Sequence, residues 1–185
     1  MRSPELRWAA VRVAAVAMLA WSCSSLPTEP TPAPKNPTPS FVRVAAPPSG
    51  AFSATAGSST TASLAIDGAV GGSIDCGNFT VIIPAGAISG QATVTITVPD
   101  PTVMHCQLSV SPPEANQLAI PFQLVANCST ASNLSAWAMQ TLRYDAGLDQ
   151  WVVVPGSEVN TLDETISTPL SHFSEYGVVD GKAGW

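Results

Sequence analysis

Thr93-Val-Thr-Ile-Thr-Val98 alternates strictly between polar and apolar side chains. Because successive side chains of a β-strand point to opposite faces, the two valines and the isoleucine share one face and the threonines share the other. β-Branched residues of both kinds favour strands. The stretch therefore predicts a half-buried strand, with an apolar face on a core and a threonine face toward water.

Similar short segments recur along the rest of the chain, separated by Pro, Gly, Asn and Asp at intervals of roughly ten residues. No run with helical periodicity follows residue 22. This spacing predicts an all-β protein, an antiparallel β-sandwich of about 8–9 strands over residues 63–180, with residues 181–185 as a tail. The predicted strands after residue 62 are Phe79–Ile83, Thr93–Val98, Val103–Val110, Leu118–Ala126, Ala136–Tyr144, Gln150–Val154, Thr161–Ser167 and His172–Val179.

The composition disfavours several classes of protein. Charged residues make up 11% of the chain, and 7 Lys+Arg stand against 13 Asp+Glu. A nucleic-acid-binding protein needs a basic face to neutralise phosphates, so we expect no nucleic-acid partner. Apolar residues make up 45%, which is enough for a core. The sequence has no G-x-S-x-G, H-E-x-x-H or glycine-rich phosphate loop, so we expect no conventional enzyme activity, no cofactor and no metal.

The N-terminal residues have the pattern of an export signal, which we place at residues 1–22. Three arginines within the first twelve residues precede nine apolar residues, Val13–Trp21. That run has the length of a signal-peptide core and is too short to span a bilayer as a helix of about 20 residues. Cys23 follows small residues, an arrangement that resembles the lipobox of bacterial lipoproteins, in which the cysteine is lipidated and becomes the mature N-terminus. Plain cleavage after Ser22, which fits a small-x-small site, is the alternative.

Residues 23–62 are predicted to be a tether. Six prolines lie between Ser24 and Ser40, and almost nothing there is apolar, so this stretch cannot bury enough surface to fold. Alternating prolines favour an extended polyproline II spacer, which would lift the following domain off a membrane. Phe41–Val44 is either a short strand or an extension of the tether, and Pro47–Thr61 is predicted to be a loop.

The charge of the exported part bears on how it meets a membrane. Three of the seven basic residues and one of the thirteen acidic residues lie in residues 1–22, so the rest keeps 4 and 12, a formal net charge of −8. Anionic headgroups repel such a chain. We therefore expect attachment to the membrane through lipid at Cys23, in a bacterial cell envelope, or secretion if Cys23 is not lipidated.

A series of motifs between residues 71 and 174 resembles one known family. Gly71-Gly72 and Phe79-Thr-Val-Ile-Ile-Pro84-Ala-Gly-Ala87 precede the strand Thr93–Val98, and Tyr144-Asp145, Gly147, Trp151 and Ser171-His172-Phe173-Ser174 follow. In this order they resemble the ZU-five domain of ankyrins and netrin receptors, over about residues 65–180. The resemblance implies a β-sandwich. In ankyrins the related module binds a cytoskeletal partner, which an exported chain does not meet, so that partner is not carried over.

Three cysteines remain after Cys23. Cys106 and Cys128 lie on successive predicted strands, and an antiparallel pairing centred near Gln117 would place them opposite each other. We therefore predict a Cys106–Cys128 disulfide, which contributes about 3 kcal/mol in the chain-entropy model. Cys76 is then a buried thiol, or it replaces one of the two partners. Zinc is disfavoured because the chain has no C-x-x-C and only two histidines.

His172-Phe173-Ser174 is the sharpest candidate for chemistry. Some animal members of the family cleave themselves between Phe and Ser of such a sequence. That resemblance implies Ser174 as the nucleophile attacking the Phe173 carbonyl in an N-to-O acyl shift, with His172 accepting its proton. The alternative, which we favour, is a closing strand with Phe173 buried and with His172 and Ser174 facing outward.

These observations predict a non-enzymatic binding or structural lipoprotein. A face or loop end of the sandwich would meet an envelope protein or a polysaccharide. Self-processing between Phe173 and Ser174 is one alternative. A carbohydrate-binding module, with Trp137, Trp151 and Trp185 as a stacking platform, is the other, although core packing is the more common use of such residues.

Overall fold

The computed structural model describes residues 39–45, 59–132, 135 and 138–181. The predicted signal peptide, the lipidation site Cys23 and most of the tether lie outside the described residues. Within the described ranges, no helix combines the length and apolar character needed to span a membrane.

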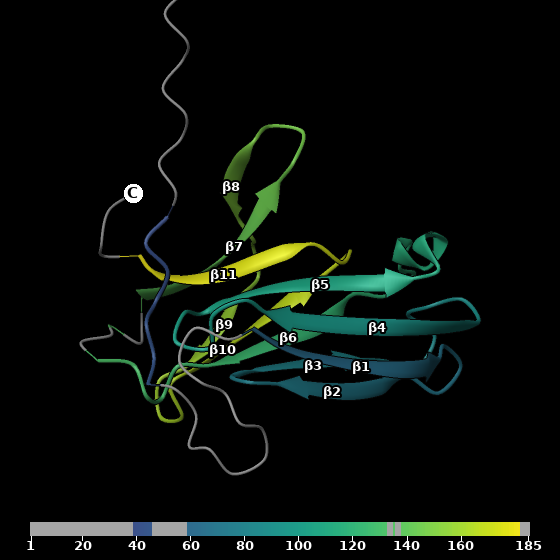
Figure 1. The fold of residues 1–185 in the computed structure, drawn as a ribbon, viewed down its shortest axis with the longest axis horizontal. Coiled ribbons are helices and arrows are strands. Elements are labelled where there is room, and N and C mark those ends of the chain that lie inside the picture. Colours follow the sequence, from purple (N-terminus) through teal and green to yellow (C-terminus); the bar gives the residue numbers. More distant parts are fainter. Residues whose placement is uncertain (1–38, 46–58, 133–134, 136–137, 182–185) are drawn as a thin grey trace, which may run out of the picture. The chain divides into compact units, whose positions relative to one another are not determined.

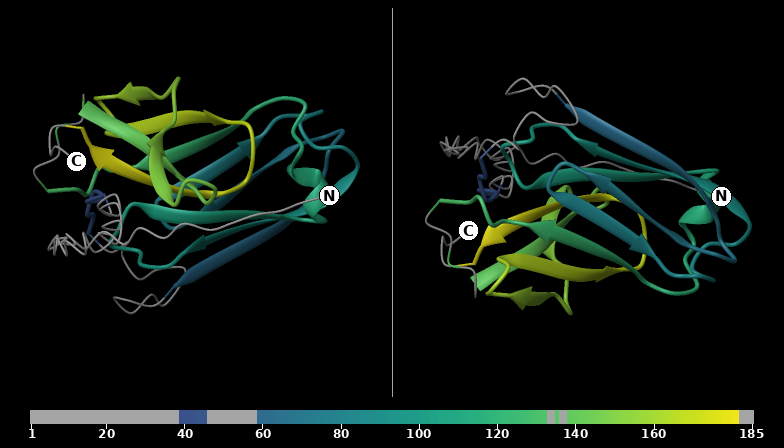
Figure 2. Two further views of the ribbon diagram at one scale, coloured as in Figure 1. Left: turned by 90° about the horizontal axis from the view of Figure 1, so that it is seen from above. Right: turned by 90° about the horizontal axis from the view of Figure 1, so that it is seen from below.

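Two antiparallel sheets pack face to face, which confirms the predicted all-β sandwich (Figures 1 and 2). The 3₁₀ turn η1 (Pro113–Asn116) lies outside the sheets. One sheet has the order β1 (Thr60–Asp67), β4 (Gln91–Val98), β5 (His105–Ser111), β11 (Glu175–Asp180), β7 (Met139–Asp145) and β8 (Gln150–Val153). The other has the order β2 (Gly72–Cys76), β3 (Phe79–Ile83), β6 (Phe122–Asn127), β10 (Thr165–Leu170) and β9 (Glu158–Asn160).

The core lies between the sheets and follows the alternation of the sequence. In β4 the side chains of Val94, Ile96 and Val98 are 0–1% exposed, whereas the threonines of the strand are partly or fully exposed. β3 alternates in the same way on the facing sheet. Each of these apolar side chains contributes about 1.5–3 kcal/mol when fully buried, so the interior of the sandwich is held mainly by such pairs of facing strands.

Consecutive strands often change sheet, and this overturns the predicted disulfide. β5 pairs with β4 and β11, whereas β6 pairs with β3 and β10, so the two do not form a hairpin. Cys106 and Cys128 therefore do not lie opposite each other on paired strands, and both are buried free thiols, as is Cys76. The prediction was wrong because spacing along the chain does not reveal whether neighbouring strands pair or cross between layers.

The segment Phe41–Val44 is joined to the six-stranded sheet rather than extending the tether. Val42 N–H donates to Val178 O at 2.8 Å, and Met104 N–H donates to Val42 O at 2.9 Å, so the segment lies between β11 and the start of β5. The Phe41 ring covers Gly177, where a Cβ would lie 2.2 Å from a ring carbon. Folded structure therefore begins before residue 63.

The two sides of the sandwich differ. On one side β1 and β2 pack against each other, and Gly72 lies close to the side chains of Leu64 and Ile66. On the other side the edge strands are β8 and β9. Near this second side, the hydroxyls of Thr141 and Thr168 form a buried hydrogen bond of 2.6 Å across the core, and the β7–β8 hairpin projects beyond the sheets (Figure 1).

Candidate functional site

A pocket of about 330 Å³ opens between β8 and β10, on the side of the sandwich where β8 and β9 form the sheet edges. Most of its wall is apolar. That part comes from β8 and the two residues after it, from the end of β10 and from the residue before β6: Val152, Val153, Val154, Pro155, Pro169, Leu170 and Pro121. The remaining lining residues are polar: Arg143, Ser171, His172 and Tyr176.

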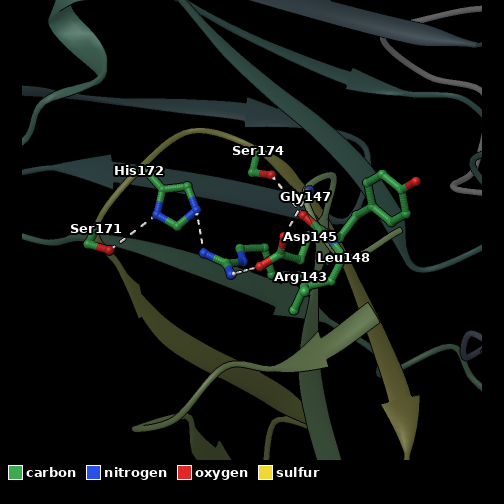
Figure 3. Close-up of polar contacts among 8 residues, drawn as sticks. Arg143, Asp145, Gly147, Leu148, Ser171, His172 and Ser174 are labelled. Carbon is green, nitrogen blue, oxygen red and sulfur yellow. Dashed lines mark hydrogen bonds and ion pairs between the residues drawn. The ribbon is translucent and has the colours of Figure 1, made fainter. Parts of the chain in front are cut away.

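The polar groups form one hydrogen-bonded network around Arg143 (Figure 3). Its Nη2 donates to Asp145 Oδ2 at 3.0 Å, and its Nη1 lies 2.7 Å from His172 Nε2. A guanidinium can only donate, so Nε2 must accept and the imidazole is neutral. The ring proton then sits on Nδ1, which donates to Ser171 Oγ at 3.2 Å. The network thus sets one tautomer of His172.

The environment keeps His172 uncharged. Burial lowers the pKa of the imidazole below its ordinary 6.5, the positive charge of Arg143 lowers it further, and Asp145 opposes both effects. The carboxylate of Asp145 balances the guanidinium charge of Arg143. The polar end of the pocket therefore presents hydrogen-bonding groups with little net charge.

The backbone of His172 is held separately from its ring. The hydroxyl of Tyr176, which is fully buried in the core, donates to the His172 carbonyl at 2.6 Å. Burial strongly raises the pKa of this phenol, so it stays protonated and keeps donating. The loop carrying His172 is thereby tied to β11.

Phe173 is buried, as the structural alternative predicted, but it does not lie in a strand. Residues 171–174 form the loop between β10 and β11, and β11 begins at Glu175. The ring of Phe173 is 5% exposed and stacks on Phe122 with centroids 4.7 Å apart. The side chain of Asn116, in η1, accepts the Phe173 N–H at 2.6 Å and donates to the Phe173 carbonyl at 3.2 Å.

The three residues of the proposed self-cleavage are not arranged for it. Ser174 Oγ donates to the Tyr144 carbonyl at 3.4 Å, and His172 faces Arg143 and Ser171 instead (Figure 3). Among the described residues, no imidazole or carboxylate accepts a hydrogen bond from the Ser174 hydroxyl. Asn116 does supply a donor to the Phe173 carbonyl, but general-base catalysis also needs an acceptor at the nucleophile.

Of the three tryptophans proposed as a platform, Trp137 and Trp185 lie outside the described residues. Trp151 is half-buried in an aromatic cluster, with ring centroids 4.9 Å from Phe41 and 5.8 Å from His105. The other histidine is thus part of this cluster, and its Nε2 lies 2.6 Å from Glu175 Oε1. Trp151 works as a packing residue here.

Two residues of the site had no place in the sequence predictions. Arg143 did carry a signal, because no other Lys or Arg occurs between residues 44 and 181, and a lone cation in an apolar strand points to a specific partner. Asn116 carried none, because its role depends on a loop 57 residues away in the sequence. In the described part of the chain, no group of three His, Cys, Asp or Glu side chains is placed to hold a metal ion.

No family model matches this sequence, and no curated protein matches it. The likeness to the ZU-five domain therefore stays a prediction, and the pocket carries the functional inference.

Proposed function

We propose that this protein is a non-enzymatic binding module with a ZU-five-like sandwich, displayed outside the cytoplasm by lipid at Cys23 and a proline-rich tether. The observation that supports binding is the pocket between β8 and β10, a largely apolar concavity with a few convergent polar groups. Ligand sites in proteins have this composition, because apolar walls supply affinity and fixed polar groups supply orientation.

The polar end suits recognition better than catalysis. A general base needs a free lone pair, and the Nε2 lone pair of His172 is already occupied by Arg143. The Ser171 hydroxyl accepts a hydrogen bond from His172 Nδ1, so His172 is not placed to take the proton of that hydroxyl. These groups act as fixed hydrogen-bonding partners, not as a nucleophile and base.

The lining also favours one class of ligand. A polysaccharide would bring many hydroxyls against valine and proline side chains, and unpaired polar groups are costly to bury. An apolar side chain of an envelope protein fits these walls. Two of the five N–H donors of Arg143 are used by His172 and Asp145, so the remaining donors suit a hydrogen-bond acceptor on the ligand.

A small probe tests the pocket directly. 4-Methylphenol combines an apolar ring with one hydroxyl, and its binding can be followed by ¹⁵N NMR of the full exported chain. We expect shifts confined to amides around the pocket, such as Val152, Leu170 and Ser171. Val152→Phe should abolish them by filling the pocket. Val70→Phe, the same change at a side chain that is 74% exposed in the β1–β2 turn, should not.

Two binding results would contradict the assignment of this pocket as the ligand site. If 4-methylphenol shifts no pocket amide at millimolar concentration, or if Val152→Phe binds it as well as Val70→Phe does, then the pocket is not the ligand site. The dispersion of the amide spectrum shows in the same experiment whether each variant is folded.

A further inference from the structure

The backbone of β8 offers a second kind of contact at the mouth of the pocket. β8 is the last strand of its sheet and pairs with β7, with Val153 opposite Leu142. Val154 N–H donates to the Thr141 carbonyl at 2.9 Å, which makes that pair a hydrogen-bonded one. Such pairs alternate along an antiparallel ladder, so the N–H and C=O groups of Trp151 and Val153 point away from β7. No described residue forms a hydrogen bond with them.

The other sheet edges are less suited to pairing. β1 and β2 pack against each other. β9 has only three residues, and Glu158 and Asn160 at its ends are exposed. β8 has the sequence Gln-Trp-Val-Val, without a charge or a proline, and Val153 is 44% exposed. Proteins usually protect edge strands with lysines, prolines or bulges. An uncharged, apolar edge strand without these features therefore indicates a surface that pairs with another polypeptide segment.

We propose that β8 accepts an extended polypeptide segment as an added strand, and that one apolar side chain of this segment enters the pocket. The inference rests on the proposed function, because the same pocket receives the side chain. Strand addition takes its affinity from main-chain hydrogen bonds and its specificity from pockets for alternate side chains. Trp151 and Val153 together offer two donors and two acceptors, spaced two residues apart.

The geometry defines the partner. Val152 lines the pocket and pairs with Arg143, which also lines it, so both side chains are on the face of the sheet toward β10. A residue of the added strand beside Val152 points to that same face. The residues before and after it in the added strand point to the opposite face of the sheet, where the Trp151 side chain lies. The partner is therefore an extended segment with an apolar residue flanked by residues that tolerate water.

Amide hydrogen exchange measured by NMR tests this pairing. The probe is the peptide acetyl-Lys-Thr-Phe-Thr-Val-Thr-Lys-amide, added to the full exported chain. In the free protein the amides of Trp151 and Val153 should exchange rapidly and those of Val152 and Val154 slowly. With the peptide bound, exchange of the Trp151 and Val153 amides should slow about tenfold or more, because only paired amides are protected.

Two variants at one position separate the backbone from the side chain. Val153→Pro removes an N–H that the fold does not use, whereas Val153→Ala keeps it. We expect Val153→Pro to lose most peptide affinity and Val153→Ala to lose little. If Val153→Pro unfolds, the same peptide N-methylated on its phenylalanine and on the two flanking threonines, which removes the N–H groups that would face β8 in either strand direction, should fail to bind the natural chain.

The outcomes distinguish the two proposals. If the peptide shifts pocket amides while exchange at Trp151 and Val153 stays unchanged, strand addition is overturned and the pocket function stands. If neither the peptide nor 4-methylphenol binds, the proposed function itself fails. If sedimentation shows a dimer whose Trp151 and Val153 amides are protected without peptide, a second copy occupies β8 and the peptide proposal is overturned.

Discussion

Replacing Asn116 by alanine should destabilise the sandwich through a residue far from it in the sequence. The Asn116 side chain pairs with both backbone groups of Phe173, at 2.6 and 3.2 Å. Phe173 itself is 5% exposed. Asn116→Ala therefore leaves a buried N–H and a buried C=O without their partner. The loop that carries His172 also loses its anchor on η1.

The size of the destabilisation follows from the two backbone groups of Phe173 that lose their hydrogen-bond partner. Each unpaired buried group costs about 1–3 kcal/mol, so we expect Asn116→Ala to lower the free energy of unfolding by about 3 kcal/mol. For a domain of this size that corresponds to a fall in Tm of about 6–12 °C. Asn160→Ala is a matched control, because the hydrogen bonds of the Asn160 side chain lie in an exposed turn. This substitution should lower the free energy of unfolding by less than about 1 kcal/mol.

Urea and thermal unfolding followed by circular dichroism measure both variants. Binding of 4-methylphenol should weaken in Asn116→Ala as well, because His172 and Ser171 lie on the anchored loop. If Asn116→Ala loses no more stability than Asn160→Ala, then Asn116 does not hold the loop that carries His172.

Three other predictions concern packing, pH and thiols. Gly177→Ala should lower the free energy of unfolding by about 1–3 kcal/mol, because a Cβ there would lie 2.2 Å from the Phe41 ring, and the loss should disappear in a Phe41→Ala background, as measured by urea unfolding. Because the folded-state pKa of His172 is below 6.5, its contribution to the free energy of unfolding is complete above pH 6.5 and is lost as the pH falls through the folded-state pKa. His172→Gln should therefore reduce the fall in the free energy of unfolding between about pH 7 and pH 5, as measured by urea unfolding at each pH. Burial raises the pKa of Cys128 to about 12 and that of Cys106 further still, so iodoacetamide should alkylate neither thiol at about pH 8 until the protein unfolds, as intact mass will show.

Strands with a clear apolar face could be predicted from the sequence, and those without one could not. Thr93–Val98 lies within β4, and Phe79–Ile83 has the same bounds as β3. β1 was not predicted as a strand, because Ile66 is its one buried side chain and its apolar residues show no period of two. Its place in the sheet comes from pairing with β4, which a local pattern does not contain.

The site was predictable only in part for a similar reason. His172, Phe173 and Ser174 stood out as a motif, and the predicted burial of Phe173 is confirmed, although Phe173 lies in a loop and not in the predicted strand. Their partners belong to other elements, Arg143 to β7 and Asn116 to η1. The direction in which His172 points depends on these distant contacts, and so does the distinction between a catalytic and a binding arrangement.

Native mass spectrometry tests most directly whether this protein recognises a ligand without transforming it or itself. The sample is the chain extracted from the membranes of its own cells, with the acetylated probe peptide added. We predict one unbroken chain that begins at an acylated Cys23 and carries one unmodified peptide, and a bare chain for Val152→Phe. A chain ending at Phe173, a cleaved peptide, or no peptide on the natural protein would contradict the account.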